Sequence, residues 1–276
     1  MAGLSELKTR VISAFIFLIV ILGGIFGGPE TFGAVVILIS VLLLWEFFGI
    51  VIPADAQSKK HLIILWTIAA ILPVIWAFIK EYQGESFNLS GFAPTALILI
   101  YIPLLFELFS RSADPFANVG SLFLGFFYIS IPMALLLDIA FVPAYDPYLI
   151  LGLFLITWVN DIGAYFVGSL MGKRPLAPAI SPNKTWEGSI GGWSMTILMS
   201  LLYFHLFLGK DWEFTIILAF IGGVFGSLGD LVESKLKRSA GIKDTGQIMP
   251  GHGGILDRLD AFIFFMPFVY LFLRYF

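Results

Sequence analysis

The sequence contains no cysteine and few charged residues. Only 13% of its 276 residues are Asp, Glu, Lys or Arg, whereas charged residues make up about 25% of soluble domains. With 59% hydrophobic residues and a mean hydropathy of +0.95, the composition excludes an ordinary soluble domain. The absence of cysteine excludes disulfides and thiolate metal ligands, so the sequence favours oxygen-bound ions such as Mg²⁺ over zinc. The net charge of −3 gives no indication of a nucleic-acid partner.

Long apolar runs recur along the whole chain. A hydrocarbon core of about 30 Å requires roughly 20 helical residues. The sequence therefore predicts an all-α, polytopic integral membrane protein with an odd number of spans and its two termini on opposite sides of the membrane. The nine predicted transmembrane helices are residues 11–27, 31–52, 61–79, 91–109, 119–142, 148–171, 189–209, 213–233 and 256–276.

The basic residues predict the orientation, because Lys and Arg accumulate in cytoplasmic loops. With a cytoplasmic N-terminus and an outside C-terminus, all but three of the 16 Lys and Arg residues fall on the cytoplasmic side. The longest connections, 172–188 and 234–255, lie on that side and are rich in basic residues. We therefore expect an anionic, water-soluble substrate on the cytoplasmic face. Residues 1–145 are predicted to be an N-terminal transmembrane scaffold, and residues 146–276 a C-terminal transmembrane catalytic region.

Four carboxylates in or beside apolar spans require an explanation, because ionised groups at such depth usually face a wet cavity. They are Asp161, Asp230, Asp257 and Asp260. Asp257 and Asp260 are three residues apart and share a helix face, while Arg258 points about 100° away. Two carboxylates that converge without a close cation favour a divalent-metal site, which Asp230 is expected to join. Mg²⁺ bound to substrate phosphate suits such oxygen ligands.

The two long cytoplasmic connections carry cations suited to phosphate. A basic arm is predicted to hold a polyphosphate, with the residues Lys235, Lys237, Arg238 and Lys243. The glycines that follow allow backbone N–H groups to approach the same anion. In the other connection, Lys184, which follows Asn183, is predicted to contact a phosphate. A further polar residue, the histidine at position 252, has two open interpretations, a loop hydrogen bond or a proton transfer.

These motifs closely resemble the signature of the CDP-diacylglycerol synthase (phosphatidate cytidylyltransferase) family over about residues 155–265. The matching segments are Asn160-Asp161, Ser181-Pro-Asn-Lys-Thr-Trp-Glu-Gly188, Ser234-Lys-Leu-Lys-Arg238, Lys243-Asp244 and Pro250-Gly-His-Gly-Gly-Ile-Leu-Asp-Arg-Leu-Asp260. The resemblance implies condensation of CTP with phosphatidate to CDP-diacylglycerol and pyrophosphate in phospholipid biosynthesis. It also implies Mg²⁺, a second cation such as K⁺, and a place in the cytoplasmic (inner) membrane.

Roles within the site follow from this resemblance as hypotheses. The expected Mg²⁺ ligands are Asp230, Asp257 and Asp260. The residues expected to bind the triphosphate are Lys237, Arg238, Lys243 and Arg258, and His252 is expected to be a further substrate-binding residue. The residues expected to shape the phosphatidate side or a second cation site are Asp161, Asn183 and Lys184. Of all these, the catalytic contribution is assigned to Lys184, Asp230, Lys237, Arg238 and Asp257.

Two other functions stay open at this point. A polyprenol or lipid kinase would use a related C-terminal site with ATP and a lipid alcohol. An ion-coupled transporter would use Asp161, Asp230 and Asp257 as an ion relay, although this does not explain the clustered order of cations, glycines and carboxylates. Small residues on several predicted helices also make a homodimer plausible, without marking one face.

Overall fold

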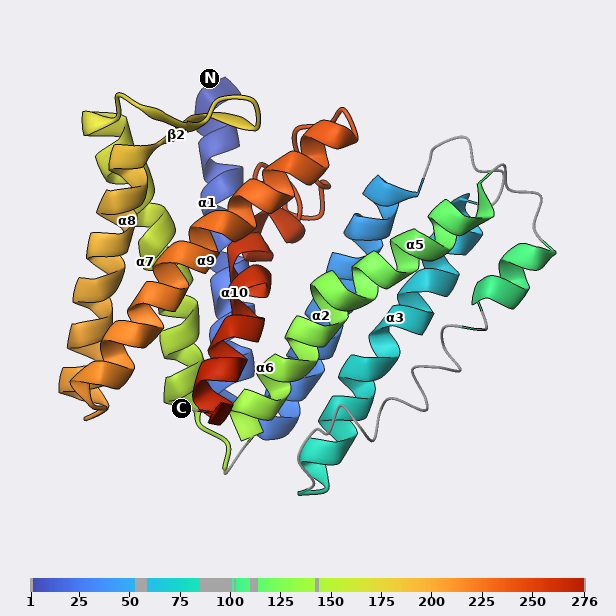
Figure 1. Ribbon diagram of the computed structural model, residues 1–276, viewed down its shortest axis with the longest axis horizontal. Helices are drawn as coiled ribbons and strands as arrows, with labels where there is room; N and C mark the ends of the chain where they lie inside the picture. Colours follow the sequence, from blue (N-terminus) through green and yellow to red (C-terminus); the bar gives the residue numbers. More distant parts are fainter. Residues whose placement is uncertain are drawn as a thin grey trace. The chain divides into compact units, whose positions relative to one another are not determined.

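The protein is almost entirely helical in a computed structural model (Figure 1). The structure describes residues 2–52, 59–84, 101, 103–109, 114–141 and 144–275. The elements of the N-terminal half are α1 (Ala2–Phe26), α2 (Pro29–Val51), α3 (Lys59–Tyr82), α5 (Pro115–Gly125), the π-helix η1 (Phe126–Ser130) and α6 (Ile131–Phe141). Those of the C-terminal half are α7 (Pro147–Met171), β1 (Pro175–Ala177), β2 (Ser181–Thr185), α8 (Trp186–Ser200), the π-helix η2 (Leu201–Phe207), α9 (Trp212–Ser239) and α10 (Leu256–Tyr275).

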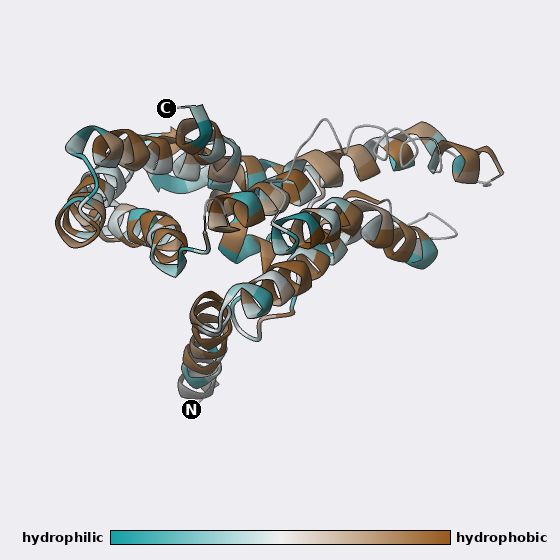
Figure 2. Cartoon of the chain, turned by 90° about the horizontal axis from the view of Figure 1, so that it is seen from below, coloured by the Kyte–Doolittle hydropathy of each residue, from teal (hydrophilic) through white to brown (hydrophobic). Residues whose placement is uncertain are grey.

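Seven helical segments within the described residues are long and apolar enough to cross a membrane. They are Lys8–Phe26, Pro29–Val51, Lys60–Tyr82, Pro115–Phe141, Pro147–Met171, Trp186–Phe207 and Trp212–Ser239. The protein is therefore an integral membrane protein, and Figure 2 shows the hydrophobic residues that run along these helices. The predicted number of nine spans and the sides of the two termini remain predictions. The predicted span 91–109 lies largely outside the described residues, and α10 carries four charged residues along its length.

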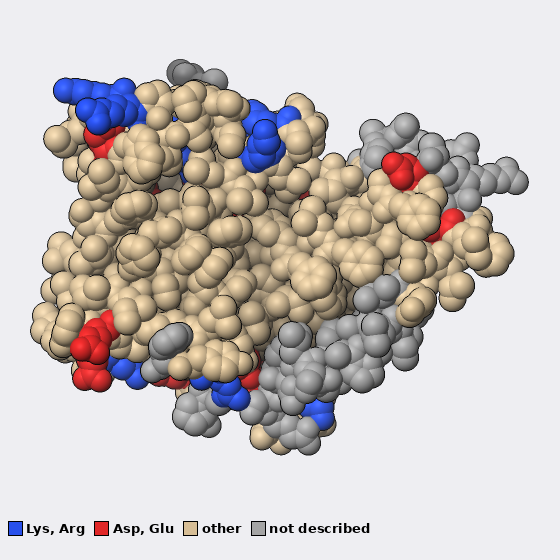
Figure 3. Space-filling model, viewed as in Figure 1, with Lys and Arg blue, Asp and Glu red and all other residues tan. Residues whose placement is uncertain are grey.

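The chain forms two compact units. The first contains Met1–Tyr145 together with Thr245–Leu256, and the second contains Asp146–Asp244 together with Asp257–Phe276. In the first unit, α2 packs against α1 and α3, and α3 packs against α6. In the second, α7 and α8 pack along each other and both contact α9. On the face drawn in Figure 3, uncharged side chains form a broad band over this second unit, with charged side chains gathered at its two ends. The functional division into scaffold and catalytic region stays a prediction.

Glycines bring α7, α8 and α9 into close contact. A Cβ atom added to Gly188 on α8 would lie 2.8 Å from the carbonyl oxygen of Ala164 on α7. A Cβ added to Gly192 would lie 2.7 Å from the carbonyl oxygen of Asn160. Backbone atoms cannot yield at such distances, so only glycine permits this approach. The close packing fixes where α7 presents its polar residues.

A short β-hairpin departs from the all-α prediction. Strands β1 and β2 pair antiparallel, with Pro175 opposite Thr185. The Thr185 hydroxyl then caps α8 by accepting a hydrogen bond of 3.1 Å from the backbone N–H of Gly188. Glu187 accepts hydrogen bonds from the backbone N–H groups of Lys173 (3.0 Å) and Arg174 (3.1 Å). The hairpin is thus tied to both ends of the connection, which places Lys184 on an ordered strand.

Candidate active site

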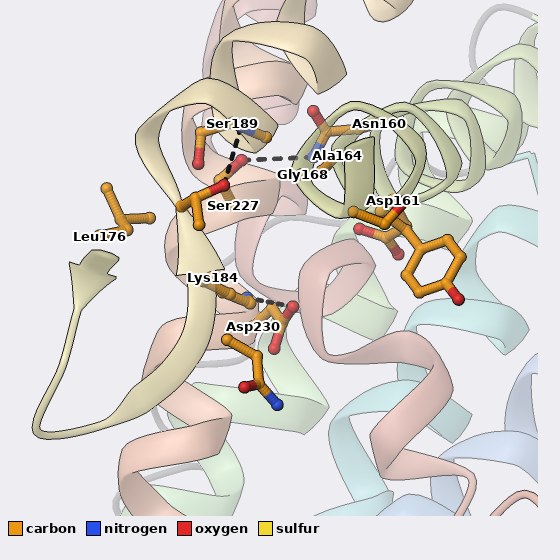
Figure 4. Close-up of a pocket in the computed structure, with 14 residues that line it drawn as sticks. Asn160, Asp161, Ala164, Gly168, Leu176, Lys184, Ser189, Ser227 and Asp230 are labelled. Atoms are coloured by element: carbon orange, nitrogen blue, oxygen red, sulfur yellow. Dashed lines mark hydrogen bonds and ion pairs between the residues drawn. The ribbon is translucent and has the colours of Figure 1, made fainter. Parts of the chain in front are cut away.

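A cavity of about 480 Å³ lies in the second unit between α7, the hairpin, α8 and α9 (Figure 4). Its polar lining includes Asp161 from α7, Asn183 and Lys184 from β2, and Asp230 from α9. These four residues were predicted as site residues from segments far apart in the sequence. The structure brings all four to one cavity, whose other lining residues include Tyr165 and several small side chains.

An ion pair joins the hairpin to α9 across this cavity. The Lys184 ammonium contacts a carboxylate oxygen of Asp230 (Figure 4). The two side chains keep 27% and 34% of their surfaces exposed. A pair that is only partly buried costs little to open, because water can solvate both charges. Lys184 is therefore available to a phosphate that enters the cavity.

Hydrogen bonds hold the cavity wall in place around Ser227. The Asn160 Nδ2 group donates to Ser227 Oγ over 3.3 Å, and Trp193 Nε1 donates to the same oxygen over 3.2 Å. Ser227 Oγ in turn donates to the carbonyl oxygen of Gly223 over 2.8 Å. One hydroxyl thus links α7, α8 and α9. Because Asn160 is only 1% exposed, this linkage fixes the backbone next to Asp161.

Three carboxylates gather next to the cavity residue Asp230. Within the described residues, ligand oxygens of Asp230, Glu233 and Asp260 all lie within 4.8 Å of one another. Asp230 and Glu233 are three residues apart on α9 and share a face, while Asp260 comes from α10. Gly229 allows the two helices to meet, since a Cβ atom there would lie 2.9 Å from the carbonyl oxygen of Asp260. The expected convergence of Asp230 with Asp260 is therefore present in the structure.

Lys237 gives the group a cation that the sequence analysis did not place there. Its ammonium lies 2.5 Å from Glu233 Oε2 and 2.7 Å from Asp257 Oδ1. This differs from the expectation that Asp257 and Asp260 converge without a close cation. Lys237 lies one helical turn beyond Glu233 on α9 and reaches Asp257 in the first turn of α10. Glu233 joins Asp230 and Asp260 in this group, and the role of Asp257 as a metal ligand stays a prediction.

The group has the chemistry of a site for a hard divalent cation. Its ligand atoms are all carboxylate oxygens, which Mg²⁺ prefers. Opposite ligands of Mg²⁺ lie about 4.2 Å apart, so oxygens within 4.8 Å need only small side-chain shifts to reach that spacing. With all groups ionised, the acids Asp230, Glu233, Asp257 and Asp260 and the cations Lys184 and Lys237 leave two net negative charges. One divalent cation neutralises that excess, so the residues fit Mg²⁺.

The remaining predicted residues lie near helix ends or in loops. Arg238, in the last turn of α9, donates to the carbonyl oxygen of Ile242 over 3.4 Å. Lys243 and Arg258 are exposed. His252 belongs to the first unit, where its Nδ1 atom lies 2.8 Å from Ser13 Oγ. This contact is the loop hydrogen bond that was one of the two open interpretations.

The sequence analysis missed Glu233 and Ser227. Glu233 carried a detectable signal, because it follows Asp230 by three residues and precedes Lys237 by four, a spacing that places all three on one helix face. Ser227 carried no such signal. Its importance depends on partners from two other helices, which the sequence around it does not reveal.

Comparison with known proteins supports the resemblance noted in the sequence. The cytidylyltransferase family matches residues 8–276. The chain is 32% identical to the phosphatidate cytidylyltransferase of Bacillus subtilis over 274 residues, which covers 98% of this chain and 99% of the relative. It is 35% identical to that of Staphylococcus saprophyticus over 263 residues, covering 95% and 96%. A 123-residue stretch is 53% identical to that of Staphylococcus aureus and covers 43% and 46%. The chain belongs to the cytidylyltransferase family.

Proposed function

We propose that this protein is a phosphatidate cytidylyltransferase. It condenses CTP with phosphatidate to give CDP-diacylglycerol and pyrophosphate, and thereby supplies an activated lipid for phospholipid synthesis. The near full-length similarity to relatives that carry this name supports the assignment. The bacterial relatives support a place in the inner membrane, and the distribution of Lys and Arg supports a site that faces the cytoplasm.

The observation that carries the proposal is the carboxylate group Asp230, Glu233 and Asp260 flanked by Lys184 and Lys237. Both substrates are anions, so their approach requires neutralisation of charge more than a strong base. A phosphate monoester has its second pKa near 6 and is substantially ionised at neutral pH. Fixed cations next to metal-binding carboxylates meet that requirement.

In the proposed reaction, a phosphate oxygen of phosphatidate attacks the α-phosphorus of CTP. A new phosphorus–oxygen bond forms, and the bond between the α-phosphorus and the bridging oxygen breaks as pyrophosphate leaves. We assign Asp230, Glu233 and Asp260 to hold Mg²⁺, which supplies charge neutralisation on the CTP phosphates when bound. Lys237 orients Glu233 and Asp257 through its two ion pairs.

The cavity suits the phosphate of phosphatidate. Lys184 is partly exposed there, and Asn183 adds amide donors. We assign these two residues to the lipid phosphate, and Asp161 to the same side or to a second cation such as K⁺. We assign Arg238, Lys243 and Arg258 as further cations for the triphosphate, and the substrate-binding role of His252 stays a prediction.

The test is pyrophosphate release by the detergent-purified protein given CTP and phosphatidate, with and without Mg²⁺. We expect release only when both substrates and Mg²⁺ are present, together with an equal amount of CDP-diacylglycerol. Replacing the two substrates, CTP and phosphatidate, with ATP and a prenol tests the kinase alternative. Folded wild-type protein that made neither product from CTP, or that phosphorylated the prenol instead, would contradict the proposal.

A further inference from the structure

A buried acidic residue of the first unit, Glu46, lies far along the chain from the carboxylate group. Glu46 lies on α2, within an apolar span, and is 4% exposed. A carboxylate at such a place is costly unless specific partners stabilise it. Its Oε2 atom accepts a hydrogen bond of 2.9 Å from the backbone N–H of Leu256, and Thr245 Oγ1 lies 3.4 Å from the same oxygen. Glu46 therefore contacts both ends of the glycine-rich segment 245–256.

The contact with Leu256 caps a helix. Leu256 is the first residue of α10, and the first N–H groups of a helix have no partner within it. A carboxylate at that position satisfies such a donor and interacts favourably with the helix dipole. Leu256 is bonded directly to Asp257, so the capped turn is the one that carries Asp257.

Two glycines allow the segment to close around the carboxylate. A Cβ atom on Gly246 would lie 2.5 Å from Glu46 Oε1, and one on Gly254 would lie 2.5 Å from Glu46 Oε2. Any side chain at either position would displace Glu46. The sequence analysis assigned the glycines of this region to contact with a substrate phosphate. These two glycines instead leave room for the Glu46 carboxylate of the protein itself.

Helix α1 supports the tip of the same segment. Ser13 Oγ lies 3.0 Å from the carbonyl oxygen of Pro250 and 2.8 Å from Nδ1 of His252. Gly251 has a φ of +77°, which favours glycine, and a Cβ atom there would lie 2.9 Å from Cγ of Arg10. The two N-terminal helices thus hold the segment at its ends and at its tip.

We propose that Glu46 is a positioning residue for CTP binding, which acts by holding segment 245–256 and the first turn of α10 in one conformation. The inference rests on the proposed function, in which Arg258, in that first turn of α10, binds the triphosphate. Glu46 touches no substrate in this account. Loss of its carboxylate should loosen the segment and weaken CTP binding before it affects the rest of the fold.

A spin label on the segment tests the anchoring without any assay of activity. Because the chain has no cysteine, Gln247→Cys gives a single labelling site at an exposed position of the segment. We expect the nitroxide to become distinctly more mobile in Glu46→Ala, and less so in Glu46→Gln, which keeps one acceptor oxygen. The matched control is Ser40→Ala, since Ser40 is also buried on α2 and donates its hydrogen bond to Val36 of the same helix. Unchanged mobility in Glu46→Ala, or an equal change in Ser40→Ala, would overturn the proposal.

Kinetics in the unlabelled variants then test the link to CTP. We expect the KM for CTP to rise about tenfold or more in Glu46→Ala, with a smaller rise in Glu46→Gln and a nearly unchanged KM for phosphatidate. A mobile label with an unchanged KM for CTP would overturn the positioning role. If the wild-type protein made no CDP-diacylglycerol, the proposed function would fail, whereas the spin-label result would still decide the anchoring.

Discussion

Glu233 on α9 and Glu46 on α2 are both buried in helices long and apolar enough to span a membrane, with exposures of 0% and 4%. Their partners differ in kind. Glu233 lies among two other carboxylates and the ammonium of Lys237, whereas Glu46 accepts a hydrogen bond from a backbone N–H group and lies beside a threonine hydroxyl. Burial of an acid within a membrane span therefore indicates a function, and the partners indicate which one.

The energetic consequences of this difference are opposite. Carboxylates held close together repel one another, so removing one charge from the Glu233 group relieves repulsion while it removes a proposed metal ligand. Removing Glu46 leaves a buried N–H group without its acceptor, which costs stability. We expect activity to depend on Glu233 without a matching loss of stability, and local order to depend on Glu46.

The largest effect is expected for Lys237→Ala. The substitution leaves Glu233 and Asp257 without their shared cation, and their side chains are only 1% and 8% exposed. Breaking a buried ion pair in this way costs about 3–5 kcal/mol, so the midpoint of thermal unfolding in detergent should fall clearly. Lys237→Arg, which keeps the charge, is the control. Equal stability of wild type and Lys237→Ala would show that the ion pairs are not formed.

Glu233→Gln should lower the activity next most strongly. Loss of an outer partner of a metal site commonly costs 10–100-fold, and loss of a ligand should cost about 100-fold or more in kcat/KM. The unfolding midpoint should fall much less than in Lys237→Ala, because one repulsive charge is gone and Lys237 keeps its ion pair with Asp257. Assays over a range of Mg²⁺ concentrations should show that Glu233→Gln needs a higher Mg²⁺ concentration than the wild type to reach half of its maximal activity. Full activity at the wild-type Mg²⁺ requirement would exclude Glu233 from the metal site.

Lys184→Ala should have a moderate effect that is confined to one substrate. Removal of a charge-assisted hydrogen bond to phosphate, worth about 1.5–3 kcal/mol, should raise the KM for phosphatidate by roughly tenfold or more. The KM for CTP should change less. Stability should hardly change, because the Lys184–Asp230 pair is partly exposed. A larger change in the KM for CTP would move Lys184 to the nucleotide side.

Ser227→Ala should give the smallest effect. It removes the shared partner of Asn160 and Trp193, at a cost of about 1–3 kcal/mol for the buried donors left behind. A modest fall in the unfolding midpoint with near-normal kinetic constants is expected. The measurement is thermal unfolding beside steady-state kinetics. A loss of activity without a loss of stability would instead place Ser227 in contact with substrate.

The sequence predicted which residues belong to the site better than it predicted which of them contact one another. Asp161 and Asp230 were identified because polar residues in apolar spans are rare and expensive, and Lys184 because a cation in a long cytoplasmic connection suits a phosphate. The structure places all three at one cavity. The spacing of Glu233 placed it on one face with Asp230, but its approach to Asp260 depends on how α9 and α10 pack, which the sequence does not show. The hairpin was missed because its five-residue strand β2 carries no alternating pattern.

The role of Glu46 illustrates the same limit in the other half of the chain. A lone acid in the predicted span 31–52 was visible in the sequence, but its partners Thr245 and Leu256 lie about 200 residues away. No local rule connects positions so distant. Only the packing of α2 against segment 245–256 shows that the N-terminal half contributes to the glycine-rich motif.

The most direct test of the central claim is Mn²⁺ binding, with Mn²⁺ used as a paramagnetic substitute for Mg²⁺ and measured by electron paramagnetic resonance. The wild-type protein and Glu46→Gln should each bind the ion in the presence of CTP, whereas Glu233→Gln should bind it at least about tenfold more weakly. Equal affinity in the wild type and in Glu233→Gln would contradict the assignment of Asp230, Glu233 and Asp260 as the metal site.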